Sequence, residues 1–138
     1  MANSKAIGVA YSDQTINGGD TLLAASSIGY VGTITSVTQA TDKATGVTIN
    51  TPAGQIVTTN ASLAAATEVA FIVTCSSCLT YDVPVVALKS GAATAGTYGV
   101  TIAAVGAGSF TVVITNLSAG SLSEALTLNY AIIRNTAT

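Results

Sequence analysis

Apolar and polar residues alternate along most of the chain from residue 32 onward. In residues 109–115, a phenylalanine, a valine and an isoleucine occupy every second position, and threonines fill most positions between them. Side chains of a β-strand point alternately to its two faces, so this period predicts strands with one apolar face. Segments with this pattern are 32–38, 45–50, 55–58, 68–74, 81–88, 97–104, 109–115 and 126–132.

Turn-forming residues separate these segments. Gly, Pro, Asn and Ser cluster at 51–54, 90–96, 105–109 and 116–121. About eight short strands at intervals of roughly 8–12 residues, with almost no helical period, are typical of an all-β fold. We therefore expect an antiparallel β-sandwich, jelly-roll-like, with an extended N-terminal arm. The alanine-rich segment 61–66 fits either one helical turn or a loop.

The segment YDVPVVAL (81–88) also resembles a strand, but it contains Pro84. Proline has no amide hydrogen to donate to a neighbouring strand. The strand is therefore expected at a sheet edge, or else Pro84 is expected among the first residues of the strand or at a bulge.

Residues 1–31 have no sustained alternation, which divides the chain into an N-terminal segment (1–31) and a β-sandwich domain (32–138). The N-terminal segment is either an extended arm that reaches another subunit or a strand pair folded onto the same core. If it is an arm, its apolar side chains are the candidate contacts to a neighbouring subunit or a larger assembly: Ile16, Leu22, Leu23, Ile28 and Tyr30.

Composition changes this picture because only 7% of the residues are charged, whereas 49% are hydrophobic. Ordinary soluble domains have about 25% charged residues. No stretch of about 20 apolar residues is present to span a membrane, and the N-terminus does not resemble a signal peptide. We expect a chain made and used without export, much of whose surface is covered by copies of itself or by another protein. The alternative is a free β-domain with a threonine-rich surface.

The two cysteines form Cys75-Ser-Ser-Cys78, a spacing also found in redox enzymes and zinc sites. A redox pair sits at the start of a helix, and no helix is predicted here. A zinc site needs four ligands, but the chain has no histidine and no third cysteine. The interpretation favoured by the sequence is a tight turn between strands, with the thiols either free or closed into a local disulfide.

The remaining chemistry is sparse. Without histidine the chain lacks the usual general base, and its six carboxylates are isolated from one another in the sequence. We therefore predict that the protein is not an enzyme and has no catalytic, metal-binding or cofactor-binding residues. The four basic residues are scattered, which argues against a nucleic-acid partner.

Two segments, 38–74 and 109–134, carry a resemblance to a known family, and the most specific part is NLSAGSLSEA (116–125). Residues 38–134 resemble a module of tailed-bacteriophage virion proteins. The resemblance implies a non-enzymatic β-sandwich that forms homotrimers. Because the flanks of the module are short, we expect a capsid decoration (cement) protein that is made in the host cytoplasm, binds the major capsid protein on the outer surface of the head and stabilises contacts between capsid subunits. The alternative is a receptor- or glycan-binding tip of a head or tail fibre.

Overall fold

The computed structural model describes residues 29–30 and 34–135. These residues form eight strands, and each predicted segment overlaps one of them. The strands are β1 (Thr35–Thr38), β2 (Val47–Thr48), β3 (Ala53–Val57), β4 (Glu68–Thr74), β5 (Val83–Ser90), β6 (Tyr98–Gly106), β7 (Ser109–Asn116) and β8 (Thr127–Ile133).

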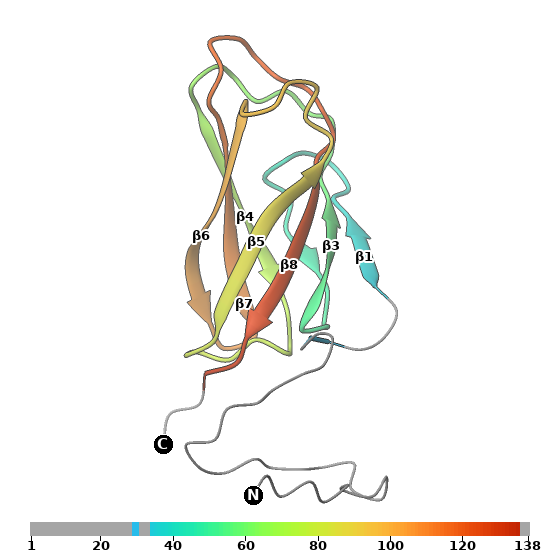
Figure 1. Ribbon diagram of the computed structural model, residues 1–138, viewed down its shortest axis with the longest axis vertical. Coiled ribbons are helices and arrows are strands. Elements are labelled where there is room, and N and C mark those ends of the chain that lie inside the picture. Colours follow the sequence, from blue (N-terminus) through green and yellow to red (C-terminus); the bar gives the residue numbers. More distant parts are fainter. Residues whose placement is uncertain (1–28, 31–33, 136–138) are drawn as a thin grey trace, which may run out of the picture.

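The strands make two four-stranded sheets that pack face to face (Figure 1). Sheet A has the order β1-β3-β8-β5, and sheet B has the order β2-β4-β7-β6. The predicted β-sandwich is therefore confirmed, but the prediction of a purely antiparallel sheet is wrong. β1 pairs with β3, and β2 with β4, in parallel.

The parallel pairs follow from the path of the chain. The first four strands alternate between the two sheets, so β1 and β3 fall in sheet A while β2 and β4 fall in sheet B. Each crossing reverses the chain direction. Strands two apart in sequence consequently run the same way and become neighbours. The other neighbouring pairs are antiparallel.

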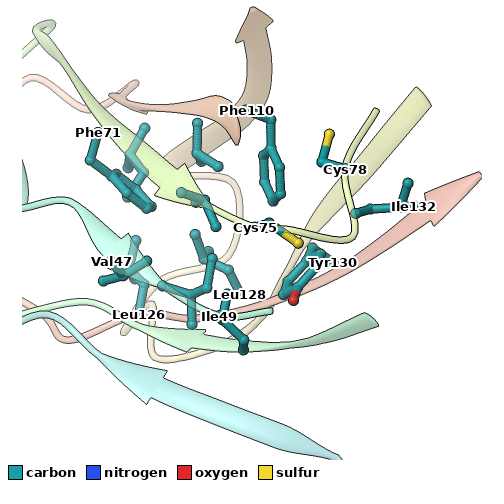
Figure 2. Close-up of a cluster of buried hydrophobic side chains, with 14 of the residues drawn as sticks. Val47, Ile49, Phe71, Cys75, Cys78, Phe110, Leu126, Leu128, Tyr130 and Ile132 are labelled. Carbon is teal, nitrogen blue, oxygen red and sulfur yellow. The ribbon is translucent and has the colours of Figure 1, made fainter. Parts of the chain in front are cut away.

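The core lies between the sheets and consists of the inward positions of the alternating segments. Phe71, Phe110 and Tyr130 are buried there, and the rings of Phe110 and Tyr130 lie 5.5 Å apart between centroids (Figure 2). The period-2 prediction of inward residues is confirmed in β4, β7 and β8, where every second side chain faces the core. Fully buried members include Ile56, Val73, Val112, Ile114, Leu126, Leu128 and Ile132.

The prediction is wrong at the first strand. β1 begins at Thr35, and Ile34, on which the predicted strand 32–38 depended, is 68% exposed. Val37 packs against the core instead and lies opposite Ile56 of β3. A short edge strand with one inward residue leaves an apolar neighbour such as Ile34 outside.

The alanine-rich segment 61–66 is a loop without a helical turn. Leu63 in this loop is buried and pairs with Leu122 through hydrogen bonds in both directions. Asn116 is also completely buried, and its amide donates to the carbonyls of Leu63, Ala64 and Gly120.

Pro84 is the second residue of β5, an edge strand of sheet A, as the sequence predicts. It lies opposite Ile132, whose amide donates across the other side of β8 to the carbonyl of Pro52. Opposed residues of an antiparallel pair point their amides either at each other or away. The amide hydrogen that Pro84 lacks would therefore point to the free edge, and no hydrogen bond to β8 is lost.

Candidate functional site

The Cys75–Cys78 segment is a tight turn. The amide of Cys78 donates to the carbonyl of Cys75 at 2.9 Å. The turn is attached to the β6–β7 hairpin, because Cys75 donates to the carbonyl of Gly108 and Gly108 donates to the carbonyl of Cys78. The predicted turn between strands is confirmed, and the thiols are not joined.

Both thiols are buried, and the two sulfur atoms lie near the backbone carbonyls of two different residues. Cys75 Sγ lies 3.4 Å from the carbonyl oxygen of Thr51, and Cys78 Sγ lies 3.7 Å from that of Ser109. Burial, with a smaller contribution from Asp82, raises the pKa of the Cys78 thiol. Because the thiolate is the reactive form, this environment makes Cys78 a poor nucleophile. Among the described residues, no three His, Cys, Asp or Glu side chains gather where a metal ion could bind.

Lys43, a charged residue, is buried. Its ammonium donates to the carbonyls of Thr59 at 2.5 Å and Glu124 at 2.7 Å. Burial lowers the pKa of Lys43, and the nearby charge of Glu124 opposes this shift. No substrate can reach an amine so enclosed. Lys43 instead ties three separate segments of the chain together.

The Glu124 carboxylate accepts a hydrogen bond of 2.7 Å from the hydroxyl of Tyr98. Burial and this bond together raise the pKa of Tyr98 to about 12. The same bond is the main cause of the lowered pKa of Glu124. A carboxylate stabilised in its ionised form is a weak general acid or base near neutral pH, so the pair contributes to structure.

Asp82 has a side chain with no solvent exposure and forms an ion pair with Arg134 at 2.8 Å. Its carboxylate also accepts from the amides of Leu79 and Asn135. Arg134 in turn donates to the carbonyl of Ser77. These contacts hold the segment before β5 against the end of β8.

Large apolar side chains are exposed where β5 begins and β8 ends. Val83 of β5 lies directly opposite Ile133 of β8, and both point away from the core. Tyr81 and Leu79 precede β5 and are also exposed. We call this surface the β5–β8 patch, and it comprises Leu79, Tyr81, Val83, Val85 and Ile133. These are five of the nine large exposed apolar residues of the described chain.

The rest of the described surface is poor in free charge. Of the seven charged side chains in residues 34–135, Lys43, Asp82, Glu124 and Arg134 are held by the contacts given above. Three others are exposed and lie outside the β5–β8 patch: Asp42, Glu68 and Lys89.

Of the predicted contact residues, Ile16, Leu22, Leu23 and Ile28 lie outside the described residues, as does nearly all of the predicted arm 1–31. Tyr30 is described and half exposed, and its hydroxyl donates to the carbonyl of Ile132. That carbonyl faces Pro52. The carbonyl of Pro52 accepts a hydrogen bond from the amide of Ile132, but Pro52 has no amide hydrogen to donate to the carbonyl of Ile132. Tyr30 supplies the donor that Pro52 lacks.

Sequence reasoning did not select the β5–β8 patch. A signal was present, because YDVPVVAL is apolar on both alternating faces and residues 132–133 are consecutive isoleucines. A strand that is apolar on both faces either is covered on both sides or exposes one apolar face. The outward side chains of β5, Val83 and Val85, are exposed on the face of sheet A that points away from sheet B.

Comparisons of the chain with protein-family models, with curated proteins and with solved structures found no match. No helix among the described residues is long and apolar enough to cross a membrane.

Proposed function

We propose that this chain is a capsid decoration protein of a tailed bacteriophage, a homotrimer that binds the major capsid protein on the outer surface of the head. The observation that carries the proposal is a β-sandwich that has only seven charged side chains in residues 34–135, with one apolar patch on its described surface. The resemblance of residues 38–74 and 109–134 to phage virion modules indicates that the assembly is a phage particle.

The physical basis is the cost of removing ions from water. Burying a charge in an interface costs several kcal/mol unless it is well paired. An alanine, or a threonine whose hydroxyl keeps a hydrogen-bond partner, is covered at much lower cost. The outer face of sheet B is of this kind, with Thr101, Thr111 and Thr115 on neighbouring strands. Such a surface suits a protein that is covered on several sides within an assembly.

A decoration protein stabilises a shell by binding only its assembled form. At a free concentration about 100 times the dissociation constant, each occupied site contributes about 2.7 kcal/mol. Many such sites act together on one particle. A modest affinity per site is therefore enough to raise the stability of the whole shell.

The experiment adds purified protein to shells that lack it. The expected result is saturable, stoichiometric attachment, together with increased resistance of the shells to heat and low salt. Shells that bind none of the protein, or bind it without any gain in stability, would contradict the proposal.

The second candidate function is a receptor- or glycan-binding fibre tip, since sugars stack on exposed aromatic rings. Tyr81 is 63% exposed and favours it, but Tyr98 and Tyr130 are buried and unable to stack. A fibre tip is expected to bind host cells and to leave shell stability unchanged, so the same shells with a cell-binding assay separate the two functions.

A further inference from the structure

We propose that residues 21–28 of this chain cover the β5–β8 patch of the same molecule, through the side chains of Leu22, Leu23 and Ile28. The patch is then a docking site for the N-terminal segment of its own chain. The inference does not depend on the proposed function, and its test uses the protein alone, without shells.

The patch is a contiguous apolar surface. Val83 and Ile133 lie opposite each other on neighbouring strands, and Val85 continues the same face of β5. Leu79 and Tyr81 extend the surface into the segment before β5. Single exposed apolar residues are normal on protein surfaces, whereas contiguous groups mark places that another surface covers.

Tyr30 brings the N-terminal segment to this place. Its hydroxyl donates to the carbonyl of Ile132, the residue directly before Ile133 of the patch. Pro52 cannot supply a donor to that carbonyl, so the tyrosine has a specific partner there. Residues 29–30 lie at the end of the sandwich where β5 begins and β8 ends (Figure 1). The segment that precedes Gly29 therefore starts beside the patch.

The segment is long enough to cross the patch. Val83 lies one strand spacing, about 5 Å, from Ile133, and Val85 is two residues or roughly 7 Å further along β5. Eight residues span up to about 26 Å when extended. Residues 21–28 can therefore reach every part of the patch from the position of Tyr30.

The composition of the segment matches an apolar surface. Residues 21–28 read TLLAASSI, with three large apolar side chains and no charge. Residues 1–20 are less suitable because they contain charged side chains: Lys5, Asp13 and Asp20. The part of the N-terminal segment nearest to Tyr30 is thus also the part best suited to cover the patch.

The charges near the patch do not oppose this contact. Arg134 follows Ile133 and is 44% exposed at its side chain, but its guanidinium is paired with the carboxylate of Asp82. Lys89 lies six residues beyond Val83 along β5. Because residues 21–28 carry no ion, they add no second cation beside Arg134 and bury no unpaired charge of their own.

The covalent connection selects this occupant over a separate molecule. An uncharged apolar surface accepts many partners, so the patch alone does not choose between them. A short tether holds its segment at an effective concentration on the order of millimolar. A free partner of equal intrinsic affinity at micromolar concentration would therefore be outcompeted by roughly 1000-fold. The segment attached beside the patch binds first.

The test measures the exposure of Tyr81 by hydroxyl-radical oxidation of the full chain, followed by mass spectrometry. Wild type is compared with the double variant Leu22→Asp/Leu23→Asp and with Ile28→Asp. Ile7→Asp/Val9→Asp is the matched control, because it adds the same charge to the N-terminal segment outside residues 21–28. Leu117, which is 62% exposed and follows β7, is the internal reference. Circular dichroism verifies that each variant is folded.

We expect Leu22→Asp/Leu23→Asp to lower the ratio of covered to uncovered patch by at least about 100-fold, because each buried leucine contributes about tenfold or more. The oxidation of Tyr81 should then rise several-fold, and it should also rise in Ile28→Asp. Leu117 should not change in any variant, and Tyr81 should stay protected in Ile7→Asp/Val9→Asp. Equal oxidation of Tyr81 in wild type, Leu22→Asp/Leu23→Asp and Ile28→Asp would overturn the inference.

Disulfide trapping tests whether the segment belongs to the same chain. Leu23→Cys/Val83→Cys is exposed to a mild oxidant, and Cys75 and Cys78 do not compete because both are completely buried. We expect a disulfide within one chain, which runs as a single chain on a non-reducing gel. Leu23→Cys/Ile72→Cys, with its second cysteine on the outer face of sheet B, should form far less of it. Disulfides mainly between chains, or equal trapping at positions 72 and 83, would overturn the assignment to the same molecule.

Discussion

The guanidinium of Arg134 lies 2.8 Å from the carboxylate of Asp82, 52 residues earlier in the chain, and the Asp82 side chain has no contact with solvent. Arg134 remains 44% exposed at its side chain. The pair therefore joins a buried anion to the protein surface. It also fixes the position of the residues that lead into the β5–β8 patch.

Replacing Asp82 with alanine should lower the free energy of unfolding by about 2–4 kcal/mol, because the amides of Leu79 and Asn135 and the guanidinium of Arg134 lose their acceptor. Urea unfolding of both proteins measures the difference. Lys89→Ala is the control, since Lys89 is exposed and should change stability by no more than about 0.5 kcal/mol. Equal urea midpoints for Asp82→Ala and Lys89→Ala would show that the pair contributes little.

Asn116→Asp tests whether the buried amide acts as a donor. The two side chains have nearly the same size, but a carboxylate cannot donate to the carbonyls of Leu63, Ala64 and Gly120. We expect a loss of about 2–4 kcal/mol at neutral pH, at least as large as for Asn116→Ala. Asn129→Asp, an exposed position on β8, should be nearly neutral in the same thermal unfolding experiment. A stable Asn116→Asp protein would mean that this loop is held in another way.

Gly91 is required by close backbone contact. Its φ is +106°, and a Cβ there would lie 2.2 Å from the carbonyl oxygen of Ala125. Gly91→Ala should cost about 3 kcal/mol or more, because backbone atoms must move. Gly108 also has a positive φ (+80°), but no atom lies within 4 Å of its Cβ position, so Gly108→Ala should cost only about 1–2 kcal/mol. Similar losses for the two variants, measured by urea unfolding, would contradict the role of this contact.

The Tyr98–Glu124 pair should make stability depend on pH at both ends of the range. The raised pKa of Tyr98 contributes stability that is present below about pH 10 and is lost as the pH rises through about 12. The lowered pKa of Glu124 contributes stability that is present above its ordinary pKa and is lost as the pH falls through its folded-state value. Tyr98→Phe should therefore flatten the stability profile in acid and reduce the alkaline loss.

The alkaline loss should be reduced and not abolished in Tyr98→Phe, because burial also raises the pKa of Tyr130. Lys43 acts in the opposite direction, since its lowered pKa makes stability rise with pH toward the ordinary lysine value. Both groups are present in wild type and variant, so the difference between the two profiles isolates the pair. Urea unfolding at intervals across the acid and alkaline ranges provides the measurement, and two parallel profiles would rule out the coupling.

The alternation in the sequence determined where the strands lie and, except at β1, which side chains face the core. This information is local, because successive side chains of a strand point to opposite faces of the sheet. The inward positions of β4, β7 and β8 were therefore predictable. The missing donor of Pro84 limited it to an edge strand, the start of a strand or a bulge, and the structure shows the first two. The turn at Cys75–Cys78 was predictable for the same reason, since no helical period follows it.

The tertiary structure alone decided which strands are neighbours, because pairing depends on how the chain crosses between the sheets. The parallel pairs β1–β3 and β2–β4 arise from this path. Lys43 and Asp82 look like surface charges in the sequence and are buried because their partners come from distant segments. The β5–β8 patch exists for the same reason, since Val83 and Ile133 become neighbours only when β5 pairs with β8.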